Sequence, residues 1–357
     1  MKTSFRDPIS VEIKRGGLLE SRHQISAVLM HPDGTLGECW GDPKMLVFPR
    51  SAVKPLQAMA LVSSGAVEKF NLTSQEIALA CASHGGETMH VEGVRNWLSK
   101  VGLQTTDLEC GSHWPSHQES AHRMIADGVF HQAEHNNCSG KHAGFLTLAL
   151  QLGYPHKNYI QPDHPVQLRV KEVLEKSCDV ELSKMEPAID GCSVPTWAMP
   201  LENIAIGMAR WGTRSKLDPE FCKASEIISK AMVLHPHLVA GQGRCCTRVL
   251  SHFKGKVLVK TGAEGVYCAA FPELGLGMAL KCHDGQKRAS EAGLVALIQK
   301  LDLVDEQQAE ILSPSKIKNH NQILVGEIKV RIPCKIGFNP LNGIYFKFKY
   351  YLNFFRN

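Results

Sequence analysis

The stretch Phe48-Pro49-Arg50-Ser51-Ala52-Val53-Lys54-Pro55 leads directly into an apolar run, Leu56 to Val62. Apolar residues in this run recur at three- and four-residue steps, which favours a buried helix over a strand. Pro55 is compatible with the first turn of such a helix, where its missing N–H costs nothing. If the helix begins near Ser51, Ser51 and Lys54 share one face, because residues three apart are neighbours. The stretch therefore predicts a buried helix that begins with an S-x-x-K pair.

This pair has the residue types of a Ser-Lys nucleophile. A serine at a helix N-terminus lies in a field that favours developing negative charge. A lysine kept neutral by burial or by nearby cations can accept the hydroxyl proton. S-x-x-K alone also occurs by chance, so a capping serine with a solvated lysine is the alternative.

Strand-like segments stand at both ends of the chain, and helical periodicity fills the middle. The predicted strands are 11–15, 24–30, 38–40, 256–260, 265–271, 276–281 and 324–330. The predicted helices are 73–81, a stretch that follows the loop 83–87 and runs through Trp97, 142–152, 166–176, 201–210, 225–233 and 286–301. This arrangement predicts an α+β fold with an antiparallel sheet whose first and last strands pair, and with 324–330 at an edge.

Composition excludes several classes of protein. The sequence has no apolar stretch of about 18 residues, which excludes a predicted membrane span. Its first residues lack the apolar segment of a secretory signal, and its 12 cysteines are scattered. We therefore expect reduced thiols in a cytoplasmic protein.

The net charge of +5 comes mainly from the C-terminal segment. Residues 332–357 contain four basic residues and no acidic residue, and they hold eight aromatic residues. The remaining body is almost neutral, so nucleic-acid binding is not indicated. We predict one catalytic domain over 1–331, followed by an atypical basic, aromatic tail over 332–357.

Two later motifs could complete a Ser-Lys site. Ser83 lies in the loop Ser83-His84-Gly85-Gly86, and Lys260-Thr261-Gly262 ends a predicted strand. With Ser51 and Lys54, they follow the order S-x-x-K, S-D-N, K-T-G of penicillin-recognising enzymes, although Ser83-His84-Gly85 departs from S-D-N. Alternatively, Ser83 is a loop residue whose hydroxyl makes a local hydrogen bond to the backbone, and Lys260 is a charged residue at the end of a strand.

Two cysteines lie in loops that contain glycine, rather than on apolar helix faces. Cys138 lies within Asn136 to His142, and Cys192 lies within Asp190 to Pro195. Two thiolates with a histidine, lysine or carboxylate could bind zinc. The spacing is not that of a zinc finger, so packing thiols remain the alternative.

Five motifs together resemble the asparaginase II family, the rhizobial-type Ser-Lys asparaginases, over about residues 8 to 331. They are Phe48-Pro49-Arg50-Ser51-x-x-Lys54-Pro55, Ala82-Ser83-His84-Gly85-Gly86-Glu87, His135-Asn136-Asn137-Cys138-Ser139-Gly140-Lys141-His142, Asp190-Gly191-Cys192-Ser193-Val194-Pro195 and Lys260-Thr261-Gly262-Ala263-Glu264-Gly265. The resemblance implies a fold similar to serine β-lactamases and glutaminases, commonly in a homodimer.

The resemblance also implies the site residues. The catalytic residues would be two Ser-Lys pairs, Ser51 with Lys54 and Ser83 with Lys260. One Zn²⁺ per chain would be bound by Cys138, Lys141 and Cys192, and would not supply the hydrolytic water. Arg50, Asp190 and His142 are the candidate substrate-binding residues.

The sequence thus predicts that Ser51 attacks the side-chain amide of L-asparagine while Lys54 accepts its proton. Neither nucleic acid nor a membrane is a predicted partner. A glutaminase or other small-amide hydrolase is one alternative. A β-lactamase-like esterase and a catalytically silent zinc- or amino-acid-binding protein are the others.

Overall fold

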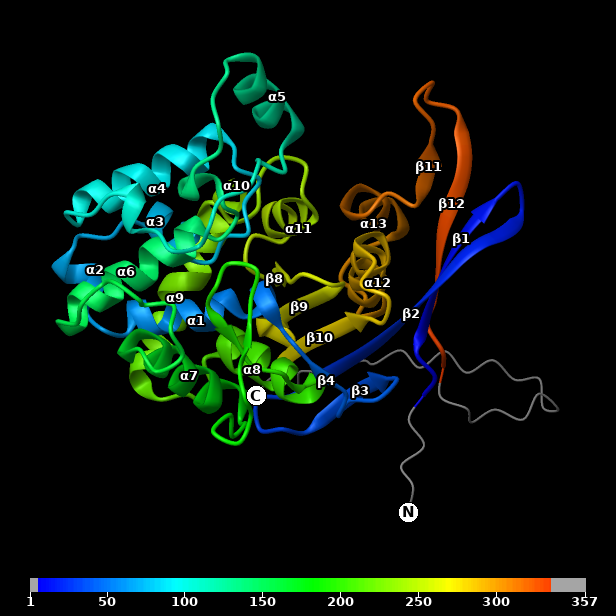
Figure 1. The fold of residues 1–357 in the computed structure, drawn as a ribbon. Helices are drawn as coiled ribbons and strands as arrows, with labels where there is room; N and C mark the ends of the chain where they lie inside the picture. The colour runs from blue at the N-terminus through cyan, green and yellow to red at the C-terminus, as the bar shows by residue number, and fades with distance from the viewer. Residues whose placement is uncertain (1–5, 335–357) are drawn as a thin grey trace, which may run out of the picture.

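An antiparallel sheet joins the two ends of the chain in the computed structural model, which describes residues 6–334 (Figure 1). Its main strand order is β11-β12-β1-β2-β10-β9-β8, and β3 also pairs with β2. The strands are β1 Ile9–Arg15, β2 Leu18–Met30, β3 Leu36–Trp40, β8 Leu258–Thr261, β9 Val266–Phe271, β10 Leu276–Cys282, β11 Lys316–Lys318 and β12 Leu324–Arg331. Helices form the middle of the chain, so the predicted α+β class is confirmed.

The first and last predicted strands pair, as expected. Val11 of β1 lies opposite Val330 of β12, and Ile13 lies opposite Ile328. The prediction that 324–330 forms an edge is wrong, because β11 pairs with the outer side of β12. With three residues and a single apolar side chain, β11 lacks the alternation from which strands are recognised.

The chain between β3 and β8 folds mainly into helices. These are α1 Lys54–Val62, α2 Ala66–Lys69, α3 Ser74–Ala80, α4 Thr88–Lys100, α5 Gln118–Ala126, α6 Ser139–Leu152, α7 Pro165–Cys178, α8 Leu201–Thr213, α9 Pro219–Leu234, α10 Pro236–Val239 and α11 Cys245–Phe253. After β10 follow α12 Lys287–Lys300 and α13 Glu306–Leu312. The short strand pairs β4 (Leu46–Val47) with β7 (Met199–Pro200) and β5 (Ala188–Ile189) with β6 (Pro195–Thr196) lie outside the main sheet.

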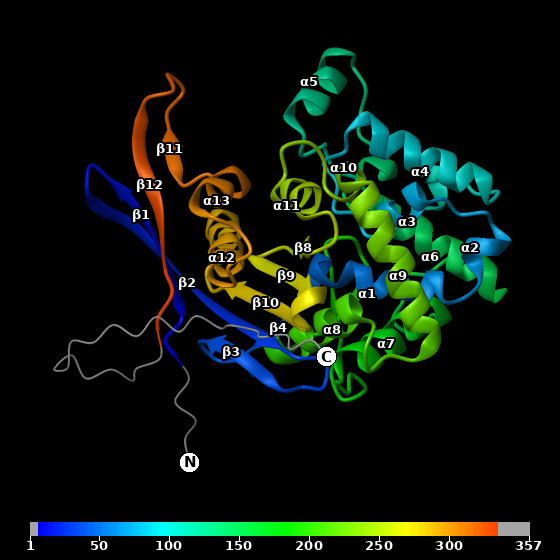
Figure 2. The same ribbon diagram turned by 180° about the vertical axis from the view of Figure 1, so that it is seen from behind.

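Helices α8 and α12 pack on the main sheet (Figure 2). Gly277 of β10 approaches the backbone of α8 at Ala205 and Ala209, while Gly293 of α12 lies against Ile25 of β2. Ile25 pairs with Cys282 of β10, so these two residues face the same side of the sheet. Gly277 and Cys282 are five residues apart on β10, and residues an odd number apart on a strand face opposite sides. The sheet is therefore covered on both faces.

Helix α1 lies at the centre of the helical region. All nine of its residues are buried, including Lys54, and α3, α6, α7 and α9 pack around it. The predicted helix near Ser51 is thus confirmed, although its first turn, Arg50–Val53, is a 3-10 helix. The predicted N-terminus of α3 is also confirmed, since Thr73 and Glu76 form a capping box.

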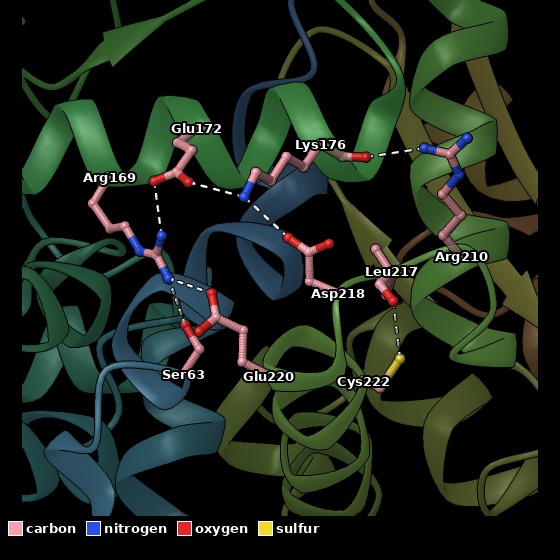
Figure 3. A network of polar contacts seen from close by, with 9 residues as sticks. All are labelled: Ser63, Arg169, Glu172, Lys176, Arg210, Leu217, Asp218, Glu220 and Cys222. Atoms are coloured by element: carbon pink, nitrogen blue, oxygen red, sulfur yellow. Dashed lines mark hydrogen bonds and ion pairs between the residues drawn. The ribbon is translucent and has the colours of Figure 1, made fainter.

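Polar contacts connect α7 to the first turn of α9 and to α8 (Figure 3). Arg169 of α7 binds Glu220 at 2.7 Å, and Lys176 binds Asp218 at 3.0 Å. Arg210 of α8 donates to the carbonyl oxygen of Lys176 at 2.9 Å. Since the side chains of the two ion pairs are partly exposed, we expect these pairs to fix the arrangement of α7 and α9 more than to stabilise it.

The sequence did not predict α2, α5, α10, α11 or α13. Helix α5 spans only nine residues and none of them is buried, so it offers too short a pattern to be recognised as a core-facing helix. No helix within residues 6–334 is long and apolar enough to cross a membrane. The 12 cysteines are all free thiols. Most of the predicted tail, 335–357, lies outside the described residues, and the proposed division at residue 331 stays a prediction.

The contact between β10 and α8 provides a test of the fold. A Cβ at position 277 would overlap the backbone of Ala205 and Ala209, so Gly277→Ala should destabilise the protein by about 3 kcal/mol. Gly275→Ala is the control, because it has open space and carries only a left-handed backbone cost of about 1 kcal/mol. Urea unfolding measures both values. Equal losses for the two variants would contradict the described packing.

Candidate active site

A pocket of about 390 Å³ lies where the end of β8 meets the helical region. Ser51, Ser83, Cys138, Asp190 and Cys192 all line it, although they come from four separate parts of the sequence. The other lining residues are Arg50, His113, Asn136, Asn137, Gly191, Arg244, Thr261, Gly262, Ala263, Glu264, Gly265, Gly285, Lys287 and Ser290. The fold therefore brings both predicted serines and both predicted zinc-binding cysteines to one cavity.

Ser83 lies between two lysines at the bottom of this site. Its Oγ is 2.8 Å from Lys260 Nζ and 3.1 Å from Lys54 Nζ. Both lysine side chains are fully buried, and Ser83 is 6% exposed. The predicted Ser83–Lys260 contact is thus present, and Lys54 is a second contact of the same hydroxyl.

The surroundings give the two lysines different roles. Lys54 donates to the Ala82 carbonyl oxygen, to Ser83 and to Cys138 Sγ at 3.2 Å, which matches the three donors of an ammonium group. Burial and the positive charge of Lys54 lower the pKa of Lys260 to about 7. Lys260 is therefore partly neutral near neutral pH and can act as a proton acceptor.

Ser51 is half-buried and lies in the 3-10 turn Arg50–Val53, which leads directly into α1. Within the described residues, no hydrogen bond joins its side chain to that of Lys54, although the sequence predicts these two as a pair. The amine of Lys54 instead reaches Ser83, because the α1 side chain extends into the buried space below the pocket. Ser51 keeps a free hydroxyl at the pocket wall.

A close backbone approach holds β8 against the Ser51 turn. A Cβ at Gly262 would lie 2.7 Å from the Pro49 carbonyl oxygen and 3.3 Å from Ala52 Cβ. Only glycine permits this separation without displacement. The glycine of the Lys260-Thr261-Gly262 motif thus has a packing role: it brings Lys260 near the turn that carries Ser51.

The loop that carries Ser83 is fixed by its backbone and by His84. Ser83 N–H donates to the Val239 carbonyl at 2.9 Å, and His84 N–H donates to the Asn137 carbonyl at 3.2 Å. Burial lowers the pKa of His84 well below its ordinary value. Its neutral ring accepts from Gly86 N–H and lies 2.9 Å from Ser139 Oγ. His84 therefore positions the loop, which the sequence motif did not reveal.

Cys138, Lys141 and Cys192 form one buried cluster at the N-terminus of α6. Lys141 Nζ is 3.0 Å from Cys192 Sγ. A hydrogen bond from Cys138, supported by Lys141, lowers the pKa of Cys192 to about 5, while the same bond and burial raise the pKa of Cys138 to about 12. Burial opposes the charge of Lys141, but the thiols and Asp190 outweigh it and raise its pKa. Cys192 is thus the thiolate of the cluster.

This cluster fits the predicted zinc site in its chemistry. It offers two sulfurs and one amine in mutual contact, and zinc prefers sulfur and nitrogen ligands. Among residues 6–334 there is no group of three or more His, Cys, Asp or Glu side chains arranged for a metal. A zinc ion here would therefore depend on Lys141, which must lose its proton to bind.

The predicted substrate-binding residues are placed differently from one another. Arg50 and Asp190 line the pocket, but they bind each other through Arg50 Nε and Asp190 Oδ1 at 2.5 Å. His142 is fully buried, does not line the pocket, and binds the Tyr159 hydroxyl at 2.7 Å. His142 is therefore placed beside Tyr159 and outside the pocket lining, and its role in substrate binding stays a prediction.

Several lining residues were missed by sequence reasoning. Arg244 precedes α11, Glu264 belongs to the turn after β8, and Lys287 begins α12. Glu264 was part of a quoted motif, but neither Arg244 nor Lys287 has a motif around it. Only the packing of α11 and α12 beside the pocket reveals them.

Comparisons with known proteins give one family match. The family model described as L-asparaginase II matches residues 11–330. A search of curated proteins gave no match.

Solved structures resemble the chain only distantly. Mglu is 13% identical with a TM-score of 0.37, covering 78% of this chain and 67% of Mglu. Mglu in its glutamate form gives the same identity and score, and the match spans 61% of that chain. A beta-lactamase from Mycobacterium bovis is 14% identical with a TM-score of 0.38, covering 76% of this chain and 94% of that protein. Scores this low carry no argument.

Proposed function

The chain belongs to the L-asparaginase II family, and on this basis we propose that it hydrolyses the side-chain amide of L-asparagine to L-aspartate and ammonia. The observation that best supports this proposal is the position of Ser83 Oγ between Lys54 and Lys260 in the pocket that Ser51 also lines. A hydroxyl beside a partly neutral amine is the arrangement needed for acyl transfer.

In the proposed reaction, Ser51 Oγ attacks the amide carbon. Ser51 is favoured as the nucleophile because it is half-buried and lines the pocket. It is also the second residue of the 3-10 turn Arg50–Val53, near the N–H groups that favour an oxyanion. When substrate brings Ser51 Oγ to the Ser83 hydroxyl, Ser83 accepts the Ser51 proton and gives its own proton to the neutral amine of Lys260, while Lys54 holds Ser83 in place.

The tetrahedral intermediate then loses ammonia as the carbon–nitrogen bond breaks. The proton held by Lys260 goes to the leaving nitrogen, and an aspartyl ester of Ser51 remains. Lys260, neutral again, takes a proton from water as the water attacks the ester. The ester carbon–oxygen bond then breaks, and the proton taken by Lys260 returns through Ser83 to the departing Ser51 oxygen. This releases aspartate, restores the Ser51 hydroxyl and leaves Lys260 neutral.

A second arrangement makes Ser83 the nucleophile. Ser83 is the serine in direct contact with a base, which is the usual structural sign of a nucleophile. It is less accessible than Ser51, however, and both lysines already occupy its hydroxyl. We therefore assign Ser83 to proton relay and make its acylation an outcome of the test below.

Cys138, Lys141 and Cys192 would hold the zinc ion. When bound, zinc would supply a positive charge for orienting a polar group of the substrate. The reaction steps above depend on the serines and lysines alone. The homodimer and the cytoplasmic location stay predictions from the sequence.

Ammonia release from L-asparagine, with L-glutamine in parallel, tests the activity and the preference. Ser51→Ala should lower kcat by at least about a thousandfold, because nucleophiles and their bases act as a unit. An asparagine analogue with a diazoketone in place of the amide should label the peptide that contains Ser51. Label on Ser83 would overturn the assignment of Ser51. If the wild-type protein released no ammonia from L-asparagine, the asparaginase proposal itself would be wrong.

The pKa of Lys260 sets the expected pH dependence. Lys260 accepts a proton only in its neutral form, so kcat/KM should fall as pH drops below about 7 and level off above it. Lys54→Met removes a positive charge that lowers this pKa, and the acidic limb of its residual activity should therefore move to higher pH. Lys287→Gln is the control and should leave the limb in place. An unchanged limb in Lys54→Met would contradict the role of Lys260.

Metal analysis tests the zinc site without reference to turnover. We expect purified wild-type protein to bind close to one zinc ion per chain. Cys192→Ser should weaken zinc binding at least about tenfold, since it removes the thiolate. The control is Cys222→Ser. Cys222 lies on α9, is not a lining residue of the pocket, and donates its thiol hydrogen to the carbonyl oxygen of Arg214 at the end of α8. Equal zinc content in both variants would rule out this cluster as the site.

A further inference from the structure

The positive side chains that line the pocket differ in whether a carboxylate already holds them. Arg50 is bound by Asp190 at 2.5 Å. Lys287 is exposed and lies 3.6 Å from Glu291. Among residues 6–334, no carboxylate lies within 4 Å of the Arg244 guanidinium, which also has no hydrogen bond from its side chain. Arg244 is thus the lining cation that remains available for an anionic ligand.

The backbone that carries Arg244 is held firmly. The preceding Gly241 and Gly243 have φ values of +116° and +67°. Gln242 N–H donates to Glu87 Oε1 at 2.9 Å, and Thr247 Oγ1 donates to the Gly241 carbonyl at 2.6 Å. This loop therefore presents a half-buried guanidinium from a fixed position, which lowers the entropy lost when a ligand binds.

Arg244 is also close to the reacting groups. It lines the same pocket as Ser51 and Ser83, and its charge adds to the effects of burial and Lys54 that lower the pKa of Lys260. The substrate proposed above is small, so its α-carboxylate must lie only a few bonds from the amide. A planar guanidinium binds a carboxylate through two parallel hydrogen bonds.

We infer that Arg244 binds the α-carboxylate of the substrate and selects amides of α-amino acids over amides without that group. This inference rests on the proposed amidase function and assigns its specificity. It differs from the sequence-based assignment to Arg50, whose guanidinium already binds Asp190 through Nε.

The test compares L-asparagine with 3-aminopropanamide, which is asparagine without its α-carboxylate. Arg244→Gln should lower kcat/KM for L-asparagine about 10- to 100-fold, as expected for loss of a charged hydrogen-bonded pair. It should leave kcat/KM for 3-aminopropanamide nearly unchanged. Arg244→Lys keeps the charge without the planar fork, and its loss should be intermediate. Lys256→Gln, at an exposed lysine outside the pocket lining, is the control and should change neither substrate by more than about threefold.

Calorimetric binding of L-aspartate and of 3-aminopropanoate gives a second measurement that needs no turnover. Arg244→Gln should weaken L-aspartate binding at least about tenfold and leave 3-aminopropanoate binding unchanged. Unchanged L-aspartate binding would overturn the inference, as would a selective loss in Lys256→Gln. Failure of the wild type to release ammonia would remove the proposed function, while the binding experiment would still decide the role of Arg244.

Discussion

Two fully buried lysines that share one serine hydroxyl are the constraint on which this structure depends. Lys54 comes from the central helix α1, Lys260 comes from strand β8, and Ser83 comes from the loop after α3. Two ammonium groups at such close range, without water, are unfavourable. The protein satisfies Lys54 with three acceptors and leaves Lys260 partly neutral. Burying two positive charges together is unfavourable, and this cost lowers the pKa of Lys260 and makes it a base. Lys260 lies where the sheet meets the helical region.

Small residues make this meeting of layers possible. Gly262 lets the end of β8 contact the turn that carries Ser51, and Gly140 lets the N-terminus of α6 lie against the backbone of Leu79 in α3. The second contact brings Cys138 to within 3.2 Å of Lys54. A side chain at Gly262 would push Lys260 away from the turn that carries Ser51. A side chain at Gly140 would push Cys138 away from Lys54. The motif glycines thus determine distances in the site and carry no chemistry of their own.

Charge pairing divides the pocket into parts that are already satisfied and parts that remain free. Arg50 with Asp190, and Lys141 with the thiolate of Cys192, compensate each other. Arg244 remains without a carboxylate among the described residues, on a loop whose backbone is tied down. An arginine can therefore line the pocket and already be paired with a carboxylate, as Arg50 is. Whether a lining cation is already paired decides whether it can bind a charged group of the substrate.

The sequence by itself determined the elements and the chemical inventory. Periodicity located β1, β2 and β8–β10 and the main helices, because these elements bury one face or all of their side chains. The motifs gave both serines, both lysines and the cysteine cluster. Only the tertiary structure decided their partners: Lys54 contacts Ser83 instead of Ser51, and His142 is buried away from the pocket. Spacing within a helix shows which residues share a face, but it does not give the direction of a long side chain. Arg244 had no local signal, since its place depends on contacts between segments that are distant in the sequence.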